Sequence, residues 1–337
     1  MRKPPPDTPD VLLATVRDGV LLAARASGIA TPSICVAYSG GLDSSVLLHV
    51  LADTVQRSGT RLSALHVHHG LSPNADAWAA HCVAACRGLE VPLRVERVTV
   101  TRKPRQSLEE VARRARYMVL NSAGTDVLAL AHHADDQAET VLLQLLRGAG
   151  PQGLAAMPVI KKASDAAGAP LLLRPLLAVT RERLEHHAKS HGISWIEDES
   201  NDSHDIKRNF LRHRIMPLLA QGFPAPGITL ARAARHQSGA AQLLDDLSAM
   251  DLAAVSDESA IDCVRLQALT RLRQANLMRG WLRRHGARQP SEARLRALLV
   301  AVAASTNDSR LKWVHENLAV TRFGGKLMIA CEGRSGT

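Results

Sequence analysis

The sequence predicts an α/β protein in which a parallel-sheet domain is followed by a smaller, mainly helical, basic domain. Between residues 34 and 147, short apolar and β-branched runs alternate with longer amphipathic stretches, which is the pattern of βαβ units around a parallel sheet. After Pro217 the chain becomes rich in Ala and Arg. Its 337 residues are too many for one average domain and sufficient for two, each with its own core.

The elements of the first domain follow in order from this pattern. The expected strands are residues 34–38, 62–67, 93–100 and 127–131, and the helices between them cover about 43–57, 74–89, 107–122 and 135–147. Ahead of them, apolar residues recur at helical spacing from Leu12 to Val20, so an N-terminal helix should pack on the same sheet. Residues 148–168 predict a loop, residues 171–177 a further strand, and Thr180 the N-cap of another helix.

A break between Gly222 and Gly227, with two prolines inside it, separates the two domains. We therefore expect domains at residues 1–220 and 221–337. The second begins with a long Ala- and Arg-rich helical region. Near its end, residues 318–323 and 326–331 flank Gly324-Gly325, which predicts a hairpin with a two-residue turn.

The charge distribution indicates a polyanionic partner for the second domain. The net charge is +10 and the pI is about 9.9. Residues 1–150 hold 16 basic and 14 acidic side chains, whereas residues 151–337 hold 26 and 18. Residues 265–296 alone contain nine Arg and one acid. Such a concentration is typical of nucleic-acid binding.

Composition also excludes several classes of protein. With 46% apolar and 22% charged residues, the chain is neither disordered nor fibrous. Apolar runs fall short of the roughly 20 residues that span a bilayer, and no signal-peptide core follows the N-terminus, so we expect a cytoplasmic protein without a membrane partner. The five scattered cysteines form no CxxC pair, which argues against a disulfide framework, a zinc site or an iron–sulfur cluster.

The first candidate site is the segment Ser39-Gly40-Gly41-Leu42-Asp43-Ser44, between a strand and a helix. Two glycines let backbone N–H groups converge, and the helix N-terminus attracts an anion. The segment is not a Walker A loop. Asp43 would repel phosphates unless a cation lies between them, and Mg²⁺ held by Asp43 resolves that conflict. An ordinary tight turn with Asp43 or Ser44 as N-cap explains the segment equally well.

The second candidate site is the segment from Ala131 to Thr140, which also follows a strand and opens a helix. Asp135, Asp136 and Glu139 cluster on neighbouring helix faces, where they could hold Mg²⁺ or an ammonium group. The alternative is helix capping, because the helix dipole favours acids in a first turn. Zinc bound by His132 and His133 is disfavoured, since the HExxH spacing is missing and thiolate partners are absent. Both candidate segments follow strands, so they should meet at one crevice.

Three other segments have simple structural explanations when taken alone. Residues 107–117 predict a surface helix with Glu–Arg pairs. Residues 66–72 predict the end of a strand, where the histidines could be either structural or functional. Residues 197–212 change from acids to bases across a turn, as a solvated charged loop would.

Taken together, these segments resemble the tRNA(Ile)-lysidine synthetase family of the N-type ATP pyrophosphatases, the PP-loop superfamily, which share an SGGxDS loop. The similar segments follow in order from residue 39 to residue 217: SGGLDSSVLL, HVHHGLS, EEVARRARY, AHHADDQAET, LLRGAGPQGLAAM, RPLL and EDESNDSHDIKRNFLRHRIMP. The RNxxR segment from Arg208 to Arg212 narrows the resemblance to this family. Two positions depart from the family pattern, because His68 stands in place of an Asn and Glu199-Ser200-Asn201 in place of an Asp-Pro-Thr-Asn type turn.

The resemblance implies a Rossmann-like ATP pyrophosphatase domain and a reaction in two steps. ATP would adenylate O2 of the wobble cytidine in an isoleucine tRNA with a CAU anticodon, and the ε-amine of free lysine would then displace AMP. This change would turn the codon read from AUG to AUA. ATP would be bound by residues 39–44. The implied roles are Mg²⁺ binding by Asp43 and Glu139, phosphate binding by Arg113 and Arg208, binding or protonation of the nucleotide by His132, and binding of the lysine ammonium by Asp136.

Most of the affinity for tRNA should come from the Arg-rich second domain and should fall with salt. Longer members of the family have a further C-terminal domain, which we expect this chain to lack. The sequence leaves the oligomeric state open, and a homodimer is one option. Two alternative functions are a PP-loop tRNA thiolase, disfavoured by the missing CxxC pairs, and a non-catalytic nucleotide-binding RNA protein. The joint presence of Asp43, Asp136 and Glu139 disfavours the latter.

Overall fold

The computed structural model describes residues 10–56, 58–99, 108–164, 166–197, 207–257, 260–305 and 311–331. The chain divides into two compact units, residues 1–238 and 239–337. This division lies within one helix, and the expected boundary between residues 220 and 221 stays a prediction. In the described ranges, no helix has the length and apolar character needed to cross a membrane.

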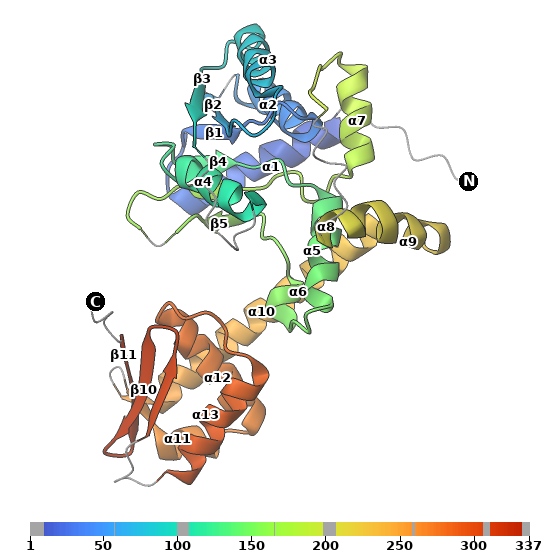
Figure 1. Cartoon of the computed structure of the whole chain (residues 1–337). Helices are drawn as coiled ribbons and strands as arrows, with labels where there is room; N and C mark the ends of the chain where they lie inside the picture. The colour runs from blue at the N-terminus through green and yellow to red at the C-terminus, as the bar shows by residue number, and fades with distance from the viewer. Residues whose placement is uncertain are drawn as a thin grey trace. The chain divides into compact units, whose positions relative to one another are not determined.

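The first unit alternates strands and helices along most of its length (Figure 1). Its elements are α1 (Asp10–Ser27), β1 (Ile34–Ala37), α2 (Leu42–Val55), β2 (Leu62–His68), α3 (Ala75–Gly88), β3 (Leu93–Arg97), α4 (Leu108–Asn121), β4 (Val127–Ala129), α5 (Ala134–Leu145), α6 (Pro151–Leu154), β5 (Ile160–Lys162), β6 (Leu171–Leu173), α7 (Arg181–Ser190), α8 (Lys207–Phe210), the π-helix η2 (Leu211–Ile215), α9 (Met216–Gly222) and the start of α10 (Pro226–Val255).

The strands form one sheet in the order β3-β2-β1-β4-β6-β5. All neighbours are parallel except β5, which runs antiparallel to β6. Side chains alternate between the two faces, so Ile34 and Val36 join a core with α1, α2, α3 and α7, whereas Cys35 joins a second core with Leu120 of α4. The predicted α/β fold with a parallel sheet is confirmed.

The direction of the strand order reverses between β1 and β4, both of which are buried in the middle of the sheet. In such sheets, the loops beyond the carboxyl ends of the two central strands diverge and leave a crevice. Residues 39–41 lie in the loop after β1 and residues 42–44 in the first turn of α2, whereas residues 131–133 lie in the loop after β4 and residues 134–136 in the first turn of α5. The sheet topology therefore brings the two candidate segments together.

The four helices expected between the strands are confirmed with bounds that differ by one or two residues, and the expected N-terminal helix is α1, which extends to Ser27. Helix α6 and strand β5 lie where a loop was expected. The loop prediction for residues 148–168 was wrong at Ile160–Lys162, because this short, lysine-rich edge strand is formed by pairing with β6 and not by its own composition. Strand β6 ends earlier than residue 177, since Pro175 cannot donate to a ladder. Strand β3, expected to reach residue 100, ends at Arg97; residues 98 and 99 are described and are not part of it, and residue 100 lies outside the described residues.

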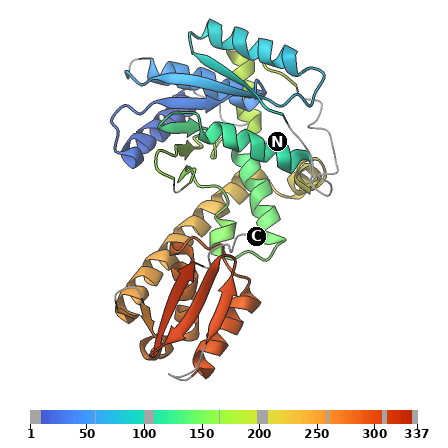
Figure 2. The same ribbon diagram turned by 60° about the vertical axis from the view of Figure 1, so that its left-hand side comes forward.

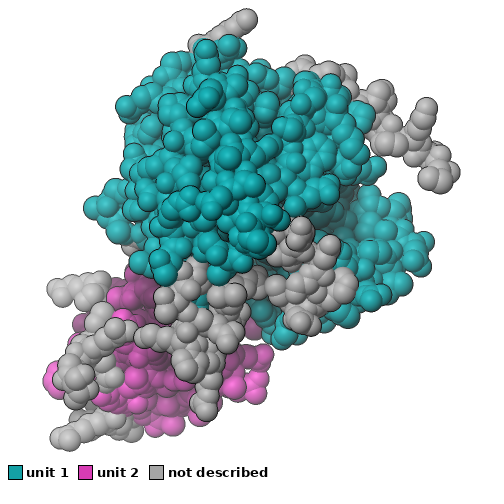
Figure 3. All heavy atoms as spheres, turned by 45° about the horizontal axis from the view of Figure 1, so that its top comes forward, with its two compact units in different colours: residues 1–238 teal, residues 239–337 magenta. Residues whose placement is uncertain are grey.

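The second unit combines helices with a small antiparallel sheet of order β7-β8-β11-β10-β9 (Figure 2, β9 to β11 in red). Besides the rest of α10, its elements are β7 (Ser256–Asp257), β8 (Ala260–Asp262), α11 (Cys263–Ala268), α12 (Arg271–Arg284), α13 (Glu292–Ala304), β9 (Lys312–His315), β10 (Leu318–Phe323) and β11 (Lys326–Cys331). Trp281 of α12, Leu298 of α13 and Val320 of β10 belong to one core. Figure 3 distinguishes the two units by colour.

The predicted hairpin of the second unit is confirmed. Strands β10 and β11 pair in antiparallel register from Leu318 and Cys331 to Phe323 and Lys326. Gly324 and Gly325 both have positive φ, +55° and +76°, as a tight two-residue turn requires. Three further strands extend this sheet, and they were not expected from the sequence.

Candidate active site

The loop between β1 and α2 is closed by hydrogen bonds between its own serines. Ser39 Oγ and Ser44 Oγ lie 3.0 Å apart, and the Gly41 N–H donates to Ser39 Oγ over 3.3 Å. The Ser44 hydroxyl donates to the Gly41 carbonyl over 3.0 Å. Gly41 is the N-cap of α2 and has no side chain to cap it. The first N–H groups of the helix are therefore available for an anion.

Glycine occupies the two positions 40 and 41 of this loop for different structural reasons. Gly40 has a φ of +83°, and a Cβ built there would lie 2.5 Å from Ile196 Cδ1 and 2.9 Å from Cys82 Sγ. Gly41 has a φ of −73°, which any residue adopts. A Cβ at Gly41 would meet only Ser39 Oγ at 3.5 Å and Ile196 O at 3.9 Å. The fold thus requires glycine at Gly40, whereas the missing side chain at Gly41 leaves room for a ligand.

The loop after β4 ends in a capping box in which histidine takes the usual place of serine. His133 Nδ1 accepts a hydrogen bond from the Asp135 N–H (3.3 Å), and Asp136 Oδ2 accepts one from the His133 N–H (3.1 Å). His133 Nε2 lies 3.6 Å from Asp43 Oδ2 and 3.6 Å from Asp136 Oδ2. Burial lowers the pKa of His133, but the carboxylates around it more than offset this and raise the pKa. His133 therefore links the two candidate segments.

Asp43 extends from the first turn of α2 into the space between these loops. Its side chain is 26% exposed, and its Oδ2 lies 3.2 Å from Nη1 of Arg181. Burial raises the pKa of Asp43, although His133 and Arg181 act in the opposite direction. A carboxylate in this setting favours a nearby cation, since the cation compensates for lost hydration.

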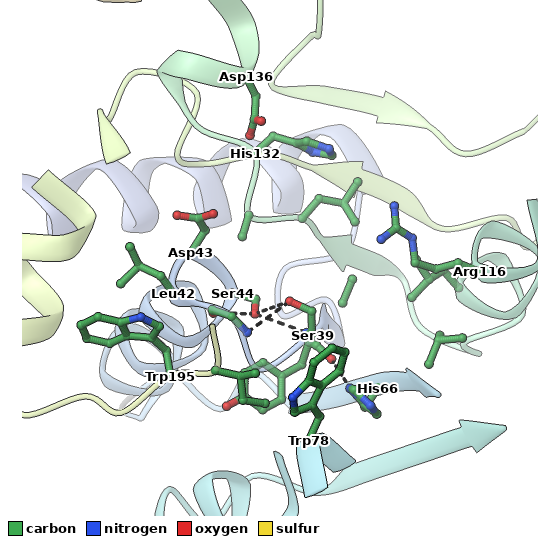
Figure 4. A pocket seen from close by; sticks show the side chains of 18 of the residues that line it. Ser39, Leu42, Asp43, Ser44, His66, Trp78, Arg116, His132, Asp136 and Trp195 are labelled. Carbon is green, nitrogen blue, oxygen red and sulfur yellow. Dashed lines mark hydrogen bonds between the residues drawn. The ribbon is translucent and has the colours of Figure 1, made fainter. Parts of the chain in front are cut away.

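A cavity of about 760 Å³ lies where the loops meet, and Figure 4 shows many of its side chains. This volume is within the usual range for small-molecule sites. One group of lining residues is charged and consists of Asp43, Arg116, Asp136, Arg181, Glu197 and Arg212. A second group is apolar or aromatic and includes Leu65, Val67, Trp78, Tyr117, Leu120, Leu130 and Trp195. Such a cavity suits a ligand with a planar apolar part and a charged part.

Of the predicted ATP-binding residues, Ser39, Gly41, Leu42, Asp43 and Ser44 line the cavity, and Gly40 does not. Of the other predicted residues, His132 and Asp136 line it. Glu139, Arg113 and Arg208 do not.

Glu139 is buried beneath the cavity between two arginines. Its side chain is 1% exposed, with Oε1 2.6 Å from Arg212 Nε and Oε2 3.0 Å from Arg208 Nε. Burial raises the pKa of Glu139, and the arginines oppose this shift. Arg212 also contacts Asp136 Oδ1 at 3.1 Å. Glu139 thus orients Arg212 toward Asp136 and would reach a metal ion only if an arginine moved.

His132 is uncharged at neutral pH. Burial is the main cause and lowers its pKa to about 4, although Asp136 opposes the shift. Its Nδ1 is buried and has no hydrogen-bond partner among the residues described in the structure. Of the two expected roles, binding the nucleotide is favoured over protonating it.

Helix α4 presents a different arginine to the cavity from the expected one. Arg113 is exposed, and its guanidinium lies 5.3 Å from the centroid of the Tyr117 ring. Tyr117 and Arg116 line the cavity. Arg113 therefore borders the site through an aromatic ring, and its role toward phosphate stays a prediction.

The unusual His68 has a structural role at the end of β2. His66 and His69 line the cavity, whereas His68 is 7% exposed and its Nε2 lies 3.2 Å from Asp76 Oδ1. Arg97 joins the same carboxylate at 2.6 Å. These contacts fasten the start of α3 to β3, so the departure from the family pattern lies outside the cavity lining. The second departure, Glu199-Ser200-Asn201, is outside the described residues.

Asp43 is the residue best placed to hold Mg²⁺. Mg²⁺ is usually bound by one or two carboxylates together with the phosphates of a nucleotide. Asp43 is partly exposed, lines the cavity and stands beside the anion-binding N-terminus of α2, so it fits this pattern. In the described part of the chain, there is no group of three or more His, Cys, Asp and Glu residues arranged for a metal ion.

Three residues that contact the predicted carboxylates received no catalytic or substrate-binding role from the sequence: His133, Arg181 and Arg212. Arg181 directly follows the N-cap Thr180, and Arg212 lies four residues after Arg208, on the same helical face. These spacings were visible in the sequence, but only the folded chain shows that both arginines face carboxylates of the cavity.

Comparison with known proteins first defines the class. A family model described as a PP-loop domain matches residues 21–219, and one described as the TilS substrate binding domain matches residues 262–328. Among solved structures, the U34-tRNA thiolase NcsA from Methanococcus maripaludis is similar with a TM-score of 0.53 over 66% of this chain and 79% of that chain. At 16% identity this similarity shows a shared fold. The first unit is a PP-loop domain.

The particular family follows from curated relatives named tRNA(Ile)-lysidine synthase. The chain is 50% identical to the Chromobacterium violaceum protein over 248 residues, which are 73% of this chain and 56% of that protein. It is 39% identical to the Coxiella burnetii protein (88% and 66% covered) and 42% identical to the Alkalilimnicola ehrlichii protein (91% and 68% covered). The chain belongs to the tRNA(Ile)-lysidine synthase family, as the sequence motifs predicted. It spans between 56% and 68% of the length of these relatives.

Proposed function

We propose that this protein uses ATP to join L-lysine to C2 of the wobble cytidine in an isoleucine tRNA with a CAU anticodon. The products are lysidine, AMP and pyrophosphate. The main support is the meeting of a phosphate-binding loop, Asp43 and Asp136 at one cavity. A nucleotide and an ammonium group can thus be held side by side, as two successive reactions at one base require.

In the first step, O2 of the cytidine attacks the α-phosphate of ATP, and pyrophosphate leaves. The residues around the N-terminus of α2 would bind the phosphates, and Asp43 would hold Mg²⁺, which would neutralise charge on the phosphates. Trp78 and the apolar side chains near it offer a surface for a planar base. The protein contributes position and electrostatics to such a step, with little covalent chemistry.

In the second step, the ε-amine of lysine attacks C2 of the adenylated cytidine and AMP leaves. Asp136 is suited to bind the lysine ammonium because its carboxylate stays ionised. Burial raises the pKa of Asp136, but His133 and His132 outweigh it, and the pKa is lowered. The amine becomes a nucleophile only after it loses a proton, so the carboxylate must hold the ammonium without fixing it permanently.

His132 is placed to bind the target base or the nucleotide as a neutral hydrogen-bonding group. Its low pKa and its Nδ1 without a protein partner in the described chain support this role. The wobble base is in a single-stranded loop, where its Watson–Crick edge is accessible to side chains.

The second unit would supply most of the affinity for tRNA. Its helix α12 has exposed arginines, among them Arg271 and Arg284. Contacts from arginine to phosphate release counterions, so binding should weaken steeply with salt. The proposal includes a cytoplasmic location. The proposed reaction does not depend on whether the protein forms a homodimer.

The test is ATP-dependent incorporation of labelled lysine into an isoleucine tRNA with a CAU anticodon. We expect incorporation into this tRNA and none into the matched control transcript with uridine at position 34. The tRNA thiolase alternative predicts sulfur transfer instead. Sulfur transfer without lysine incorporation would refute the proposal.

A further inference from the structure

Arg181 is a cavity residue whose backbone is fixed and whose side chain faces Asp43. Its N–H donates to Asp135 Oδ2 over 2.9 Å. Thr180, just before it, caps α7 by accepting a hydrogen bond from the Arg183 N–H (3.3 Å). The Arg181 side chain is 51% exposed and lines the same cavity as Ser39 and Gly41 of the loop between β1 and α2. The main chain at Arg181 is therefore held in place, while the side chain has room to move.

The two arginines that meet carboxylates of this cavity are held very differently. Arg212 Nε lies 2.6 Å from Glu139, whose side chain is 1% exposed. Arg181 Nη1 lies 3.2 Å and 3.5 Å from the two oxygens of Asp43, longer than an optimal charged pair. Exposed, loosely formed ion pairs contribute little free energy. The pair between Arg181 and Asp43 can therefore separate at low cost, whereas Arg212 stays on Glu139.

Asp43 would have a further positive partner, beside His133 and Arg181, when Mg²⁺ and ATP bind, as the proposed function requires. A divalent ion on the Asp43 carboxylate repels the guanidinium beside it. The phosphates of ATP would at the same time lie near the N-terminus of α2, where Arg181 contacts Asp43. A guanidinium donates paired hydrogen bonds to phosphate oxygens, so it gains a stronger partner than the one it leaves.

We propose that Arg181 binds the triphosphate of ATP and exchanges Asp43 for it on nucleotide binding. In the ligand-free protein, Arg181 serves as the counter-cation of Asp43. In the complex, Mg²⁺ takes over Asp43, and Arg181 stabilises negative charge on the phosphates, including the charge that develops on the departing pyrophosphate. This inference rests on the proposed use of ATP.

A purely structural role for Arg181 predicts a different outcome. If Arg181 only fastened α7 to the loop, its removal would disorder Asp43 and weaken metal binding. If Arg181 exchanges partners, its removal should free Asp43 for a metal ion and should weaken the binding of the nucleotide. Only the proposal therefore predicts weaker nucleotide binding without weaker metal binding.

The test compares Arg181→Ala and Arg181→Lys with wild type, with Lys189→Ala as a matched control. Lys189 is an exposed cation on the same helix, paired with Glu185 at 2.6 Å and absent from the cavity lining. Calorimetry measures binding of Mg²⁺ with an ATP analogue that cannot be cleaved between its α- and β-phosphates. Electron paramagnetic resonance measures Mn²⁺ binding to the nucleotide-free protein.

We expect Arg181→Ala to bind the analogue about 10- to 100-fold more weakly, the usual effect of losing a charged hydrogen bond. Its Mn²⁺ affinity should equal or exceed that of wild type, Arg181→Lys should be intermediate for the analogue, and Lys189→Ala should be unchanged. Analogue binding equal to wild type, or weaker Mn²⁺ binding, in Arg181→Ala overturns the inference alone. If wild type itself binds no analogue, the proposed function fails, and the inference with it.

Discussion

Replacing Gly40 with alanine should strongly destabilise the first unit. The φ of +83° at Gly40 is in the left-handed region, which costs an L residue about 1–2 kcal/mol. The new Cβ would also lie 2.5 Å from Ile196 Cδ1 and 2.9 Å from Cys82 Sγ. The end of the Ile196 side chain can shift, but Cys82 is fully buried. Overpacking of this kind adds about 1–3 kcal/mol, so we expect a total loss of about 2–5 kcal/mol in the free energy of unfolding.

Gly124→Ala is the matched control for the backbone part of this loss. Gly124 has a φ of +65°, and a Cβ added there would have no neighbour within 4 Å, so only the backbone cost applies. Hydrogen exchange of α2 peptides at increasing urea reports the stability of the first unit separately from the second. If Gly40→Ala is no more destabilising than Gly124→Ala, the claim that Ile196 and Cys82 leave no room for a Cβ at Gly40 is refuted.

Three further predictions concern carboxylates. Asp43→Asn should abolish pyrophosphate release, whereas Asp136→Asn should reduce lysine transfer more than pyrophosphate release. If both variants lose both steps equally, the assigned roles are contradicted. Glu139→Gln should lower the free energy of unfolding by about 1–3 kcal/mol, because it leaves two partly buried arginines without their carboxylate, and an unchanged urea midpoint would count against this. Hydrogen bonds from Ser33 lower the pKa of Asp126 below its ordinary value of 3.8, so this carboxylate stabilises the fold above that pH and loses its effect as the pH falls through its folded-state pKa. Asp126→Asn should therefore be less stable than wild type at about pH 6, with a difference that shrinks below about pH 3.8; a difference that is constant with pH would refute this linkage.

The sequence was sufficient for most of the first unit because its central strands are apolar and buried. The β1 and β4 strands consist of apolar residues, and each is followed by an amphipathic helix. Strand β5 was missed because Ile160-Lys161-Lys162 is too short and polar to predict a strand, and only pairing with β6 creates it.

The candidate site was predictable only where local sequence determines position. Asp43 and Asp136 were found because each follows a strand, and parallel strands bring their carboxyl ends together. Glu139 was expected to bind metal because it lies near Asp136 on the helix. Its two arginine partners lie far along the chain, and no local pattern indicates that they occupy both carboxylate oxygens.

The most direct test of the proposed chemistry is which substrate ATP activates. With ATP labelled at the α-phosphate, isoleucine tRNA and no lysine, the protein should release pyrophosphate and attach labelled AMP to the tRNA. Added lysine should then release this AMP and remain on the tRNA. If pyrophosphate instead forms with lysine and without tRNA, the lysine carboxylate is the activated group, and activation of the cytidine is contradicted.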